Sequence, residues 1–306
     1  MTRPEEQRSA DRILSTVIAR HALTNAVVSY VTSSFNTIYR VSADQGEFML
    51  RVSPPQRIHE PDVTEAEEAW TDRVRGAGLA APQLIRAFDG STVLTEGRGE
   101  GGQAVLLTWL DGTDLQWPLT PGQIELLGEL SAQLHRAVSP TATRTPGVLD
   151  ASNPILFAVP DLLSTAPSAH RALFRRRFSE AQACLREVWS TANEMPRVLH
   201  FDLTPRNVLQ LADGRLAVID CQDLAWGHPA QDIANTIYGI TRGELDETVT
   251  ALFRAGDQRH AAWPDLDAGR LRQLFVTRRI VMVNLALTLR RPGLAAYLDR
   301  HAAALS

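Results

Sequence analysis

Residues 200–220 read His-Phe-Asp-Leu-Thr-Pro-Arg-Asn-Val-Leu-Gln-Leu-Ala-Asp-Gly-Arg-Leu-Ala-Val-Ile-Asp and combine a polar loop with a hairpin. Apolar residues alternate on both sides of Asp213-Gly214, a dipeptide typical of a two-residue turn in which both residues take positive φ. With this turn, Asn207 and Asp220 lie directly opposite each other, with Cβ atoms roughly 5 Å apart. We therefore expect that one divalent metal ion can bind both side chains.

The same stretch fits the catalytic loop of protein kinases, His-x-Asp-Leu-x-x-x-Asn. In that loop the aspartate, here Asp202, accepts or orients the proton of the acceptor hydroxyl, and the asparagine, here Asn207, binds Mg²⁺. An acidic residue at the end of the following hairpin, here Asp220, completes the metal site. The alternative is that His200 and Asp202 only form hydrogen bonds within a loop, while Asn207 begins a strand.

These motifs resemble those of the aminoglycoside phosphotransferase family, which has the protein-kinase-like fold and includes antibiotic kinases, choline kinases and type II homoserine kinases. Members typically carry His-Gly-Asp-x-x-x-x-Asn, then Ile-Asp, then Gly-x-x-x-x-Asp-Leu-Ala. The matching stretches of this chain are His200-Phe-Asp202, Ile219-Asp220 and Gly227-His-Pro-Ala-Gln-Asp232-Ile-Ala. The resemblance extends from about residue 26 to the C-terminus and implies that Asp232, with His200, supports the catalytic loop.

The chain departs from the family pattern at two places, with Phe201 where Gly or Ala is usual and Cys221-Gln222 after the metal-binding aspartate. Neither change removes a catalytic atom, but both can reshape the floor of the substrate site. The resemblance implies an α+β, protein-kinase-like fold with two lobes. Residues 1–110 form a small ATP-binding lobe with an antiparallel five-stranded sheet and one helix. Residues 111–306 form a larger, mostly helical lobe with the catalytic loop, the metal site and the acceptor pocket.

The chain contains no lysine, because all 31 of its basic residues are arginine. This excludes Schiff-base enzymes and phosphate-binding loops that depend on a lysine amine. In a kinase fold, an arginine must then replace the lysine of the third strand. Residues 48–52 alternate in a strand pattern, and Arg51 is the candidate for binding the phosphates, which a guanidinium can do bidentately. The alternative is that Arg51 is an exposed strand residue.

A glutamate on the helix predicted at residues 62–76 pairs with this cation in the kinase fold. Glu67 matches the expected position by its distance from Gly78 and Pro82, and Glu68 is the second choice. The pattern Thr64-Glu-Ala-Glu67 is also a capping box. Glu67 could therefore serve only to begin the helix.

Two further segments are predicted to contact the nucleotide. Ser33 and Ser34 lie between two predicted strands, where the kinase fold covers the ATP phosphates, and they can offer amide and hydroxyl donors although the usual glycines are absent. Leu107, Thr108 and Trp109 resemble the family's hinge, whose main chain binds adenine. We expect these residues to complete an ATP and Mg²⁺ site.

Composition narrows the remaining classes. The chain has 306 residues, a formal net charge of −4 and 44% hydrophobic residues, so it can bury one large or two moderate cores. No stretch of 18 apolar residues and no apolar leader occurs, and the two cysteines imply no disulfide framework, which predicts a cytoplasmic protein without a membrane contact. Basic residues are scattered, which argues against nucleic-acid binding. The oligomeric state stays open.

These observations predict a kinase that transfers phosphate from ATP to a hydroxyl of a small molecule. The short segment between Asp220 and Asp232 leaves no room for a regulatory activation segment. The alternatives are a serine/threonine protein kinase of the bacterial stress-response type and a non-catalytic nucleotide-binding module. An aminoglycoside site needs carboxylates, a choline site an aromatic cage and a homoserine site a cation. The carboxylate candidates are Asp111, Asp114, Asp223, Glu244, Asp246 and Glu247. The candidates for an aromatic cage are Trp109, Trp117 and Trp226, and those for the cation are Arg206 and Arg278.

Overall fold

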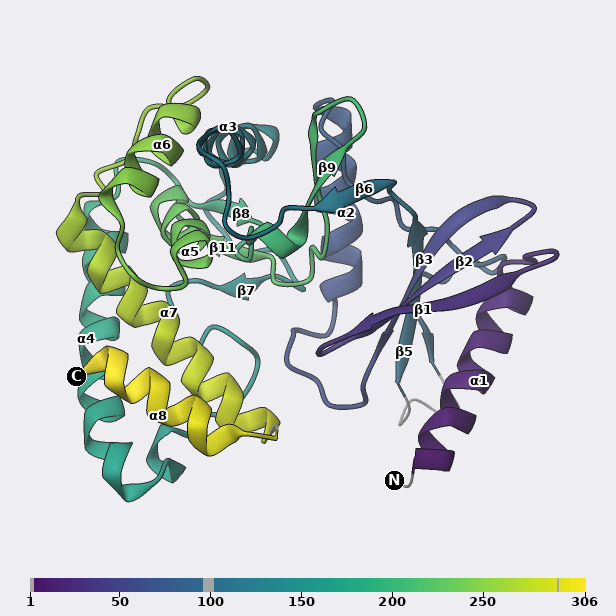
Figure 1. Cartoon of the computed structure of the whole chain (residues 1–306), viewed down its shortest axis with the longest axis horizontal. Helices are drawn as coiled ribbons and strands as arrows, with labels where there is room; N and C mark the ends of the chain where they lie inside the picture. Colours follow the sequence, from purple (N-terminus) through teal and green to yellow (C-terminus); the bar gives the residue numbers. More distant parts are fainter. Residues whose placement is uncertain (1–2, 96–101, 291) are drawn as a thin grey trace. The chain divides into compact units, whose positions relative to one another are not determined.

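The computed structural model describes residues 3–95, 102–290 and 292–306, with side chains from residue 12 onward (Figure 1). The chain forms two compact units. Unit 1 takes in Met1–Arg57 and Ala81–Asp111, and unit 2 takes in Ile58–Ala80 and Gly112–Ser306. The predicted functional division at residue 110 stays a prediction. The units differ from it in one segment, because residues 58–80 pack with unit 2.

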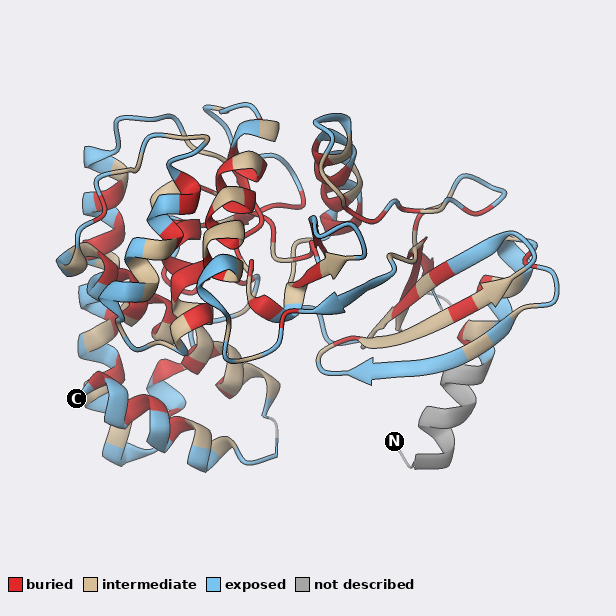
Figure 2. Cartoon of the chain, turned by 45° about the horizontal axis from the view of Figure 1, so that its top comes forward, coloured by how far each residue is buried: buried red, intermediate tan, exposed pale blue. Residues whose placement is uncertain are grey.

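Unit 1 is an antiparallel five-stranded sheet with strand order β1-β2-β3-β5-β4, as the fold-class prediction requires. Helix α1 packs against β4 and β5, and its Ile13 and Val17 enter the core under the sheet. Strand β1 at the sheet edge is largely exposed, as Figure 2 shows in pale blue. The elements are α1 (Arg3–Arg20), β1 (Val27–Ser33), β2 (Thr37–Ala43), β3 (Gly46–Ser53), β4 (Leu94–Thr95) and β5 (Gln103–Thr108).

Unit 2 is mostly helical, and α4, α7 and α8 lie side by side around a shared apolar core (Figure 1). Two three-stranded sheets, with strand orders β10-β9-β6 and β7-β11-β8, carry the polar loops. The helices are α2 (Val63–Gly76), α3 (Pro121–Ala137), α4 (Ser168–Thr191), α5 (Pro229–Thr241), α6 (Glu247–Asp257), α7 (Ala268–Leu289) and α8 (Leu294–Leu305). The strands are β6 (Gly112–Asp114), β7 (Leu149–Asp150), β8 (Arg197–Leu199), β9 (Val208–Leu211), β10 (Leu216–Val218) and β11 (Ala225–Gly227). Among the described residues, no helix has the length and apolar character needed to cross a bilayer.

The predicted register of the β9–β10 hairpin is wrong by one residue. Leu211 and Arg215 close the loop, so it holds three residues instead of two, and only Gly214 takes a positive φ, at 84°. Three-residue hairpin loops place a glycine in this left-handed conformation. Asn207 is consequently bonded to Ile219, whose amide donates to the Asn207 carbonyl over 2.9 Å, and Asp220 follows one residue later.

The predicted capping box at residues 64–67 is also wrong. Helix α2 begins at Val63 with Asp62 as its N-cap, so Thr64 lies inside the first turn, and no side chain caps the helix. Thr64 and Glu67 are both buried. Glu67 therefore does not serve as a solvent-facing capping residue, and its burial calls for another explanation.

Helices α3 and α6 approach each other through two glycines. A Cβ atom at Gly128 would lie 2.0 Å from the Phe253 carbonyl oxygen, and one at Gly256 would lie 1.9 Å from the Glu125 carbonyl oxygen. Both contacts involve backbone, which cannot move as a flexible side chain can. The two helices can pack this closely only because neither position has a side chain.

We expect Gly128→Ala to lower the free energy of unfolding by about 1–3 kcal/mol, the usual range for overpacking. Gly122→Ala is the matched control, because it lies on the same helix with open space around it and should stabilise by a few tenths to about 1 kcal/mol. Urea unfolding of both variants checks the pair. Equal stability of the two variants would contradict the close helix contact.

Asp257, at the end of α6, is a buried carboxylate whose oxygens have no hydrogen-bond partner among the described residues. Burial raises its pKa to about 6, with Glu194 adding to the effect and His135 and His260 opposing it. The folded state then binds more protons than the unfolded chain between pH 4 and 6. Stability from this group therefore falls as pH rises through that window.

We expect Asp257→Asn to raise the free energy of unfolding at pH 7 by up to about 3 kcal/mol. The gain should vanish below about pH 4, where the aspartate is protonated in both states. Chemical unfolding at pH 4 and pH 7 measures the difference. A gain of the same size at both values would show that charge burial is not its cause.

Candidate active site

The catalytic-loop carboxylate of Asp202 is held at both of its oxygens. The Asn207 amide donates to Oδ2 over 2.8 Å, and the Arg278 guanidinium donates to Oδ1 over 2.6 Å. The Arg278 side chain is only 9% exposed, whereas that of Asp202 is 25% exposed. The carboxylate is therefore fixed in direction but still open to an incoming group.

The orientation of the Asn207 side chain follows from its partners. Its Nδ2 also donates to the Asp202 main-chain carbonyl over 2.8 Å, so both amide hydrogens point to oxygens that can only accept. The amide oxygen takes no part in these bonds. It is a neutral oxygen donor of the kind that Mg²⁺ and Ca²⁺ prefer.

Asp220 follows the hairpin in a left-handed backbone conformation, with φ at 56°. Asparagine and aspartate tolerate this region better than other residues with side chains. Among the described residues, no group of three or more His, Cys, Asp or Glu side chains could hold a metal ion. A metal at this place would thus depend on Asn207, Asp220 and oxygens that arrive with the substrate.

A second acidic residue, Asp223, influences Asp202 electrostatically. Burial raises the pKa of Asp202, with Arg278 opposing and Asp223 adding to the rise. Burial also disfavours ionised Asp223, but its hydrogen bond with His59, at 2.7 Å, and the nearby positive charges lower its pKa overall. Burial and the charge of Asp223 thus raise the pKa of Asp202, whereas the bond with His59 lowers that of Asp223.

The main chain of the catalytic loop is fixed by Asp232 on α5. Its Oδ1 accepts from the Phe201 amide and its Oδ2 accepts from His135, each over 2.8 Å. His200 donates to the Ile219 carbonyl over 3.1 Å and accepts from the Asp202 amide over 3.3 Å, which joins the loop to the hairpin. His200 and Asp232 thus join this loop to the hairpin and to α5, and their supporting role in catalysis stays a prediction.

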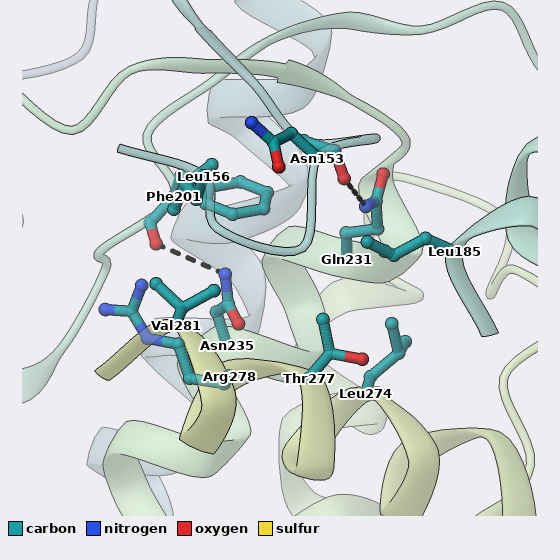
Figure 3. A pocket seen from close by; sticks show the side chains of 11 residues that line it. Asn153, Leu156, Leu185, Phe201, Gln231, Asn235, Leu274, Thr277, Arg278 and Val281 are labelled. Carbon is teal, nitrogen blue, oxygen red and sulfur yellow. Dashed lines mark hydrogen bonds between the residues drawn. The ribbon is translucent and has the colours of Figure 1, made fainter. Parts of the chain in front are cut away.

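Phe201 takes a positive φ of 66°, a conformation that costs a residue with a side chain roughly 1–2 kcal/mol and that glycine adopts freely. Its ring is buried and lies beside a cavity of about 20 Å³, room for roughly one water molecule (Figure 3). This cavity is too small for an acceptor. It is lined by Ala151, Asn153, Leu156, Leu185, Phe201, Gln231, Asn235, Leu274, Thr277, Arg278 and Val281.

In unit 1, Arg51 on β3 is 1% exposed, which rules out the alternative of an exposed strand residue. In unit 2, Glu67 on α2 is 0% exposed, whereas Glu68 is partly accessible. A guanidinium and a carboxylate withdrawn from water each require a counter-charge. Burial therefore favours Glu67 over Glu68 as the functional glutamate.

The remaining predicted nucleotide contacts lie in unit 1. Ser33 and Ser34 are exposed at the β1–β2 turn, where the Ser33 hydroxyl bonds that of Thr37. The Thr108 amide donates to the Gln83 carbonyl over 2.9 Å, and the Trp109 amide donates to the Glu47 carbonyl over 3.1 Å. Leu107 is fully buried. These two amides are already used within the unit, so a nucleotide would have to use carbonyls of this segment.

Comparison with known proteins identifies the family of the chain. A family model described as "Phosphotransferase enzyme family" matches residues 32–271 of the chain. The chain belongs to the phosphotransferase enzyme family. This confirms the predicted class of enzyme, a phosphotransferase.

Solved structures share the fold of this phosphotransferase at low sequence identity. An amicoumacin kinase in complex with AMP-PNP and Ca²⁺ is 14% identical, with a TM-score of 0.75 over 99% of this chain and 96% of that one. A microcompartment-associated aminopropanol kinase is 20% identical, with a TM-score of 0.76 over 96% and 94%. A spectinomycin phosphotransferase with ADP and its antibiotic is 11% identical, with a TM-score of 0.62 over 96% and 93%. A search of curated proteins gives no match.

Two residues that lie around Asp202 and Asp223 were not predicted in their observed places. His59 belongs to no motif, and Arg278 is predicted only as a possible cation for a substrate carboxylate. One signal could have indicated Arg278. It shares the spacing of Leu271, Leu274 and Val281, so it lies on the buried stripe of α7 where an apolar residue is expected.

Proposed function

We propose that this phosphotransferase transfers the γ-phosphoryl group of ATP to a hydroxyl of a small molecule, in a reaction that requires Mg²⁺. The observation that supports this most is the carboxylate of Asp202, fixed at both oxygens and still 25% exposed. In the reaction, the acceptor oxygen forms a bond to the γ-phosphorus while the bond between that phosphorus and the ADP oxygen breaks. The acceptor hydroxyl loses its proton, so the products are the phosphorylated acceptor, ADP and a proton.

Asp202 would accept the hydrogen bond of the acceptor hydroxyl and align its oxygen with the phosphorus. Such alignment is the larger part of catalysis in phosphoryl transfer, since the transition state needs little covalent help. The raised pKa of Asp202 increases its affinity for the leaving proton. A carboxylate with a lowered pKa would hold that proton less well.

The Asn207 amide oxygen and the Asp220 carboxylate would hold Mg²⁺, which neutralises phosphate charge when it is bound. Both are oxygen donors, as this cation requires. On the nucleotide side, we propose that Arg51 pairs with Glu67 and binds the phosphates, because both are buried charges. Ser33 and Ser34 would add hydroxyl donors, and carbonyls of residues 107–109 would face the adenine.

The candidate residues for a choline-type cage are already engaged. One face of Trp109 is covered by Arg40 at 4.8 Å and one face of Trp117 by Arg242 at 4.5 Å. Trp226 packs against Trp189 at 4.8 Å. These contacts disfavour a quaternary ammonium as the acceptor. The acceptors to be tested are amino alcohols, aminoglycosides, hydroxy amino acids and sugars. The first two classes are included because structures similar to this chain are named as an aminopropanol kinase and an aminoglycoside phosphotransferase.

Transfer from γ-labelled ATP with Mg²⁺ tests the proposal against this acceptor panel and a generic protein acceptor. We expect transfer to one class of small molecule. Labelling of the protein acceptor instead would favour the stress-response type of protein kinase, and nucleotide binding without any transfer would favour a non-catalytic module. We also propose a cytoplasmic location, which the two free, buried cysteines support.

A further inference from the structure

Arg278 brings a positive charge to the catalytic carboxylate from a distant part of the chain. It lies in the middle of α7, 76 positions along the chain from Asp202, and donates Nη2 to Asp202 Oδ1 over 2.6 Å. A charge-assisted bond of this length is among the stronger polar contacts in proteins. Because Asp202 is the proposed catalytic group, we expect that a loss of this contact changes the rate of the reaction.

The surroundings of Arg278 do not suit a receptor for a substrate anion. The residue is buried, and its Nη1 has neither water access nor a hydrogen-bond partner among the described residues. The guanidinium already forms an ion pair with the Asp202 carboxylate over 2.6 Å, and its charge also acts on Asp223, whose pKa it lowers. An additional anion would therefore meet a guanidinium that is largely neutralised and covered.

The geometry instead suits control of the direction of Asp202. A single hydrogen bond from Asn207 to one oxygen would leave the carboxylate able to rotate about its Cβ–Cγ bond. The bond from Arg278 to the second oxygen removes this freedom. Figure 3 shows Arg278 beside the catalytic loop at Phe201, with Val281 and Thr277 from the same helix.

Helix α7 is itself held firmly enough for this role. Asp267 caps its first turn through the Arg270 amide. Asn284 bonds the main chain at Leu162 and at Pro160, and Arg279 bonds the Gly243 carbonyl. Arg278 therefore extends from a backbone fixed on both sides, which reduces the conformational freedom lost when the pair forms.

We propose that Arg278 is a positioning residue for Asp202, and that it sets the catalytic carboxylate's direction without binding substrate. This inference rests on the proposed phosphotransferase function. A misplaced catalytic group can cost about 100-fold in rate without weakening binding. If Arg278 orients Asp202, its loss should therefore lower kcat and leave KM nearly unchanged. If Arg278 bound a substrate anion, its loss should instead raise KM.

The test compares Arg278→Gln and Arg278→Lys with the wild type, using the acceptor found in the panel or, failing that, slow transfer to water. We expect Arg278→Gln to lower kcat by about 100-fold with KM for ATP and acceptor nearly unchanged. Arg278→Lys should recover much of the loss, because one ammonium can replace the Nη2 contact. Arg272→Gln, an exposed arginine on the same helix, is the matched control and should behave as the wild type.

Chemical rescue protects the test against loss of folding. In Arg278→Ala, added guanidinium chloride at millimolar concentration should raise kcat, which a general structural defect would not allow. A raised acceptor KM with unchanged kcat would overturn the proposal in favour of substrate binding, and so would full activity of Arg278→Gln. A wild type that transfers phosphate to nothing, water included, would instead refute the proposed function itself.

Discussion

Asp202→Asn should lower kcat by about 10²–10⁴-fold, the usual range for loss of a positioned acid–base group. The amide keeps the size of the carboxylate but loses its charge and its affinity for a proton. Nucleotide binding should persist, since the hydrogen bonds of Asp202 within the described part of the chain go to Asn207, Arg278, His200 and the Thr204 amide. Steady-state transfer from γ-labelled ATP measures kcat, and titration calorimetry measures nucleotide affinity.

Asp72→Asn is the matched control for this variant, because Asp72 is an exposed aspartate on α2 that pairs with Arg75 on the same helix. It should leave both kcat and nucleotide affinity unchanged. Since Asp202→Asn removes the counter-charge of a buried guanidinium, its unfolding curve must be compared with the wild type. A folded Asp202→Asn variant with wild-type kcat would refute the assignment of Asp202.

Asp220→Asn should lower kcat by about 10²–10³-fold, the effect of removing one preorganised electrostatic group. Asparagine is chosen because position 220 has a positive φ, which asparagine tolerates and alanine does not. The variant therefore removes the charge without straining the backbone. The affinity for Mn²⁺, used as a spectroscopic probe, should fall in parallel when it is measured by electron paramagnetic resonance.

Asp213→Asn supplies the control, since Asp213 lies in the same hairpin and accepts hydrogen bonds from the amide and the guanidinium of the exposed Arg215. It should change neither Mn²⁺ affinity nor turnover. Undiminished Mn²⁺ binding in Asp220→Asn would show that the metal is held elsewhere. Undiminished turnover would remove Asp220 from the mechanism.

The sequence was most informative where function depends on neighbours along the chain. Asp202, Asn207 and Asp220 lie within one loop and hairpin, and helix α2, predicted at residues 62–76, spans Val63–Gly76. The hairpin register failed because Asp213-Gly214 occurs both in two-residue turns and in three-residue loops, where only the glycine needs a positive φ. Local composition does not distinguish these loops.

The parts that were missed depend on tertiary packing. The contacts of Arg278 with Asp202 and of His59 with Asp223 join residues separated by 76 and 164 positions. Neither a periodicity nor a motif in the sequence predicts which loop packs against the buried face of a given helix. The role of Glu67 was open for a similar reason, because its burial depends on where α2 begins and on what covers it.

The segment between Asp220 and Asp232 is short and contains strand β11. Residues 225–227 are paired on one side with β8 and on the other with β7, and the chain enters α5 directly afterwards. No length of chain is left that a modifying enzyme could order or release. We therefore expect that phosphorylation within this segment does not switch the enzyme on or off.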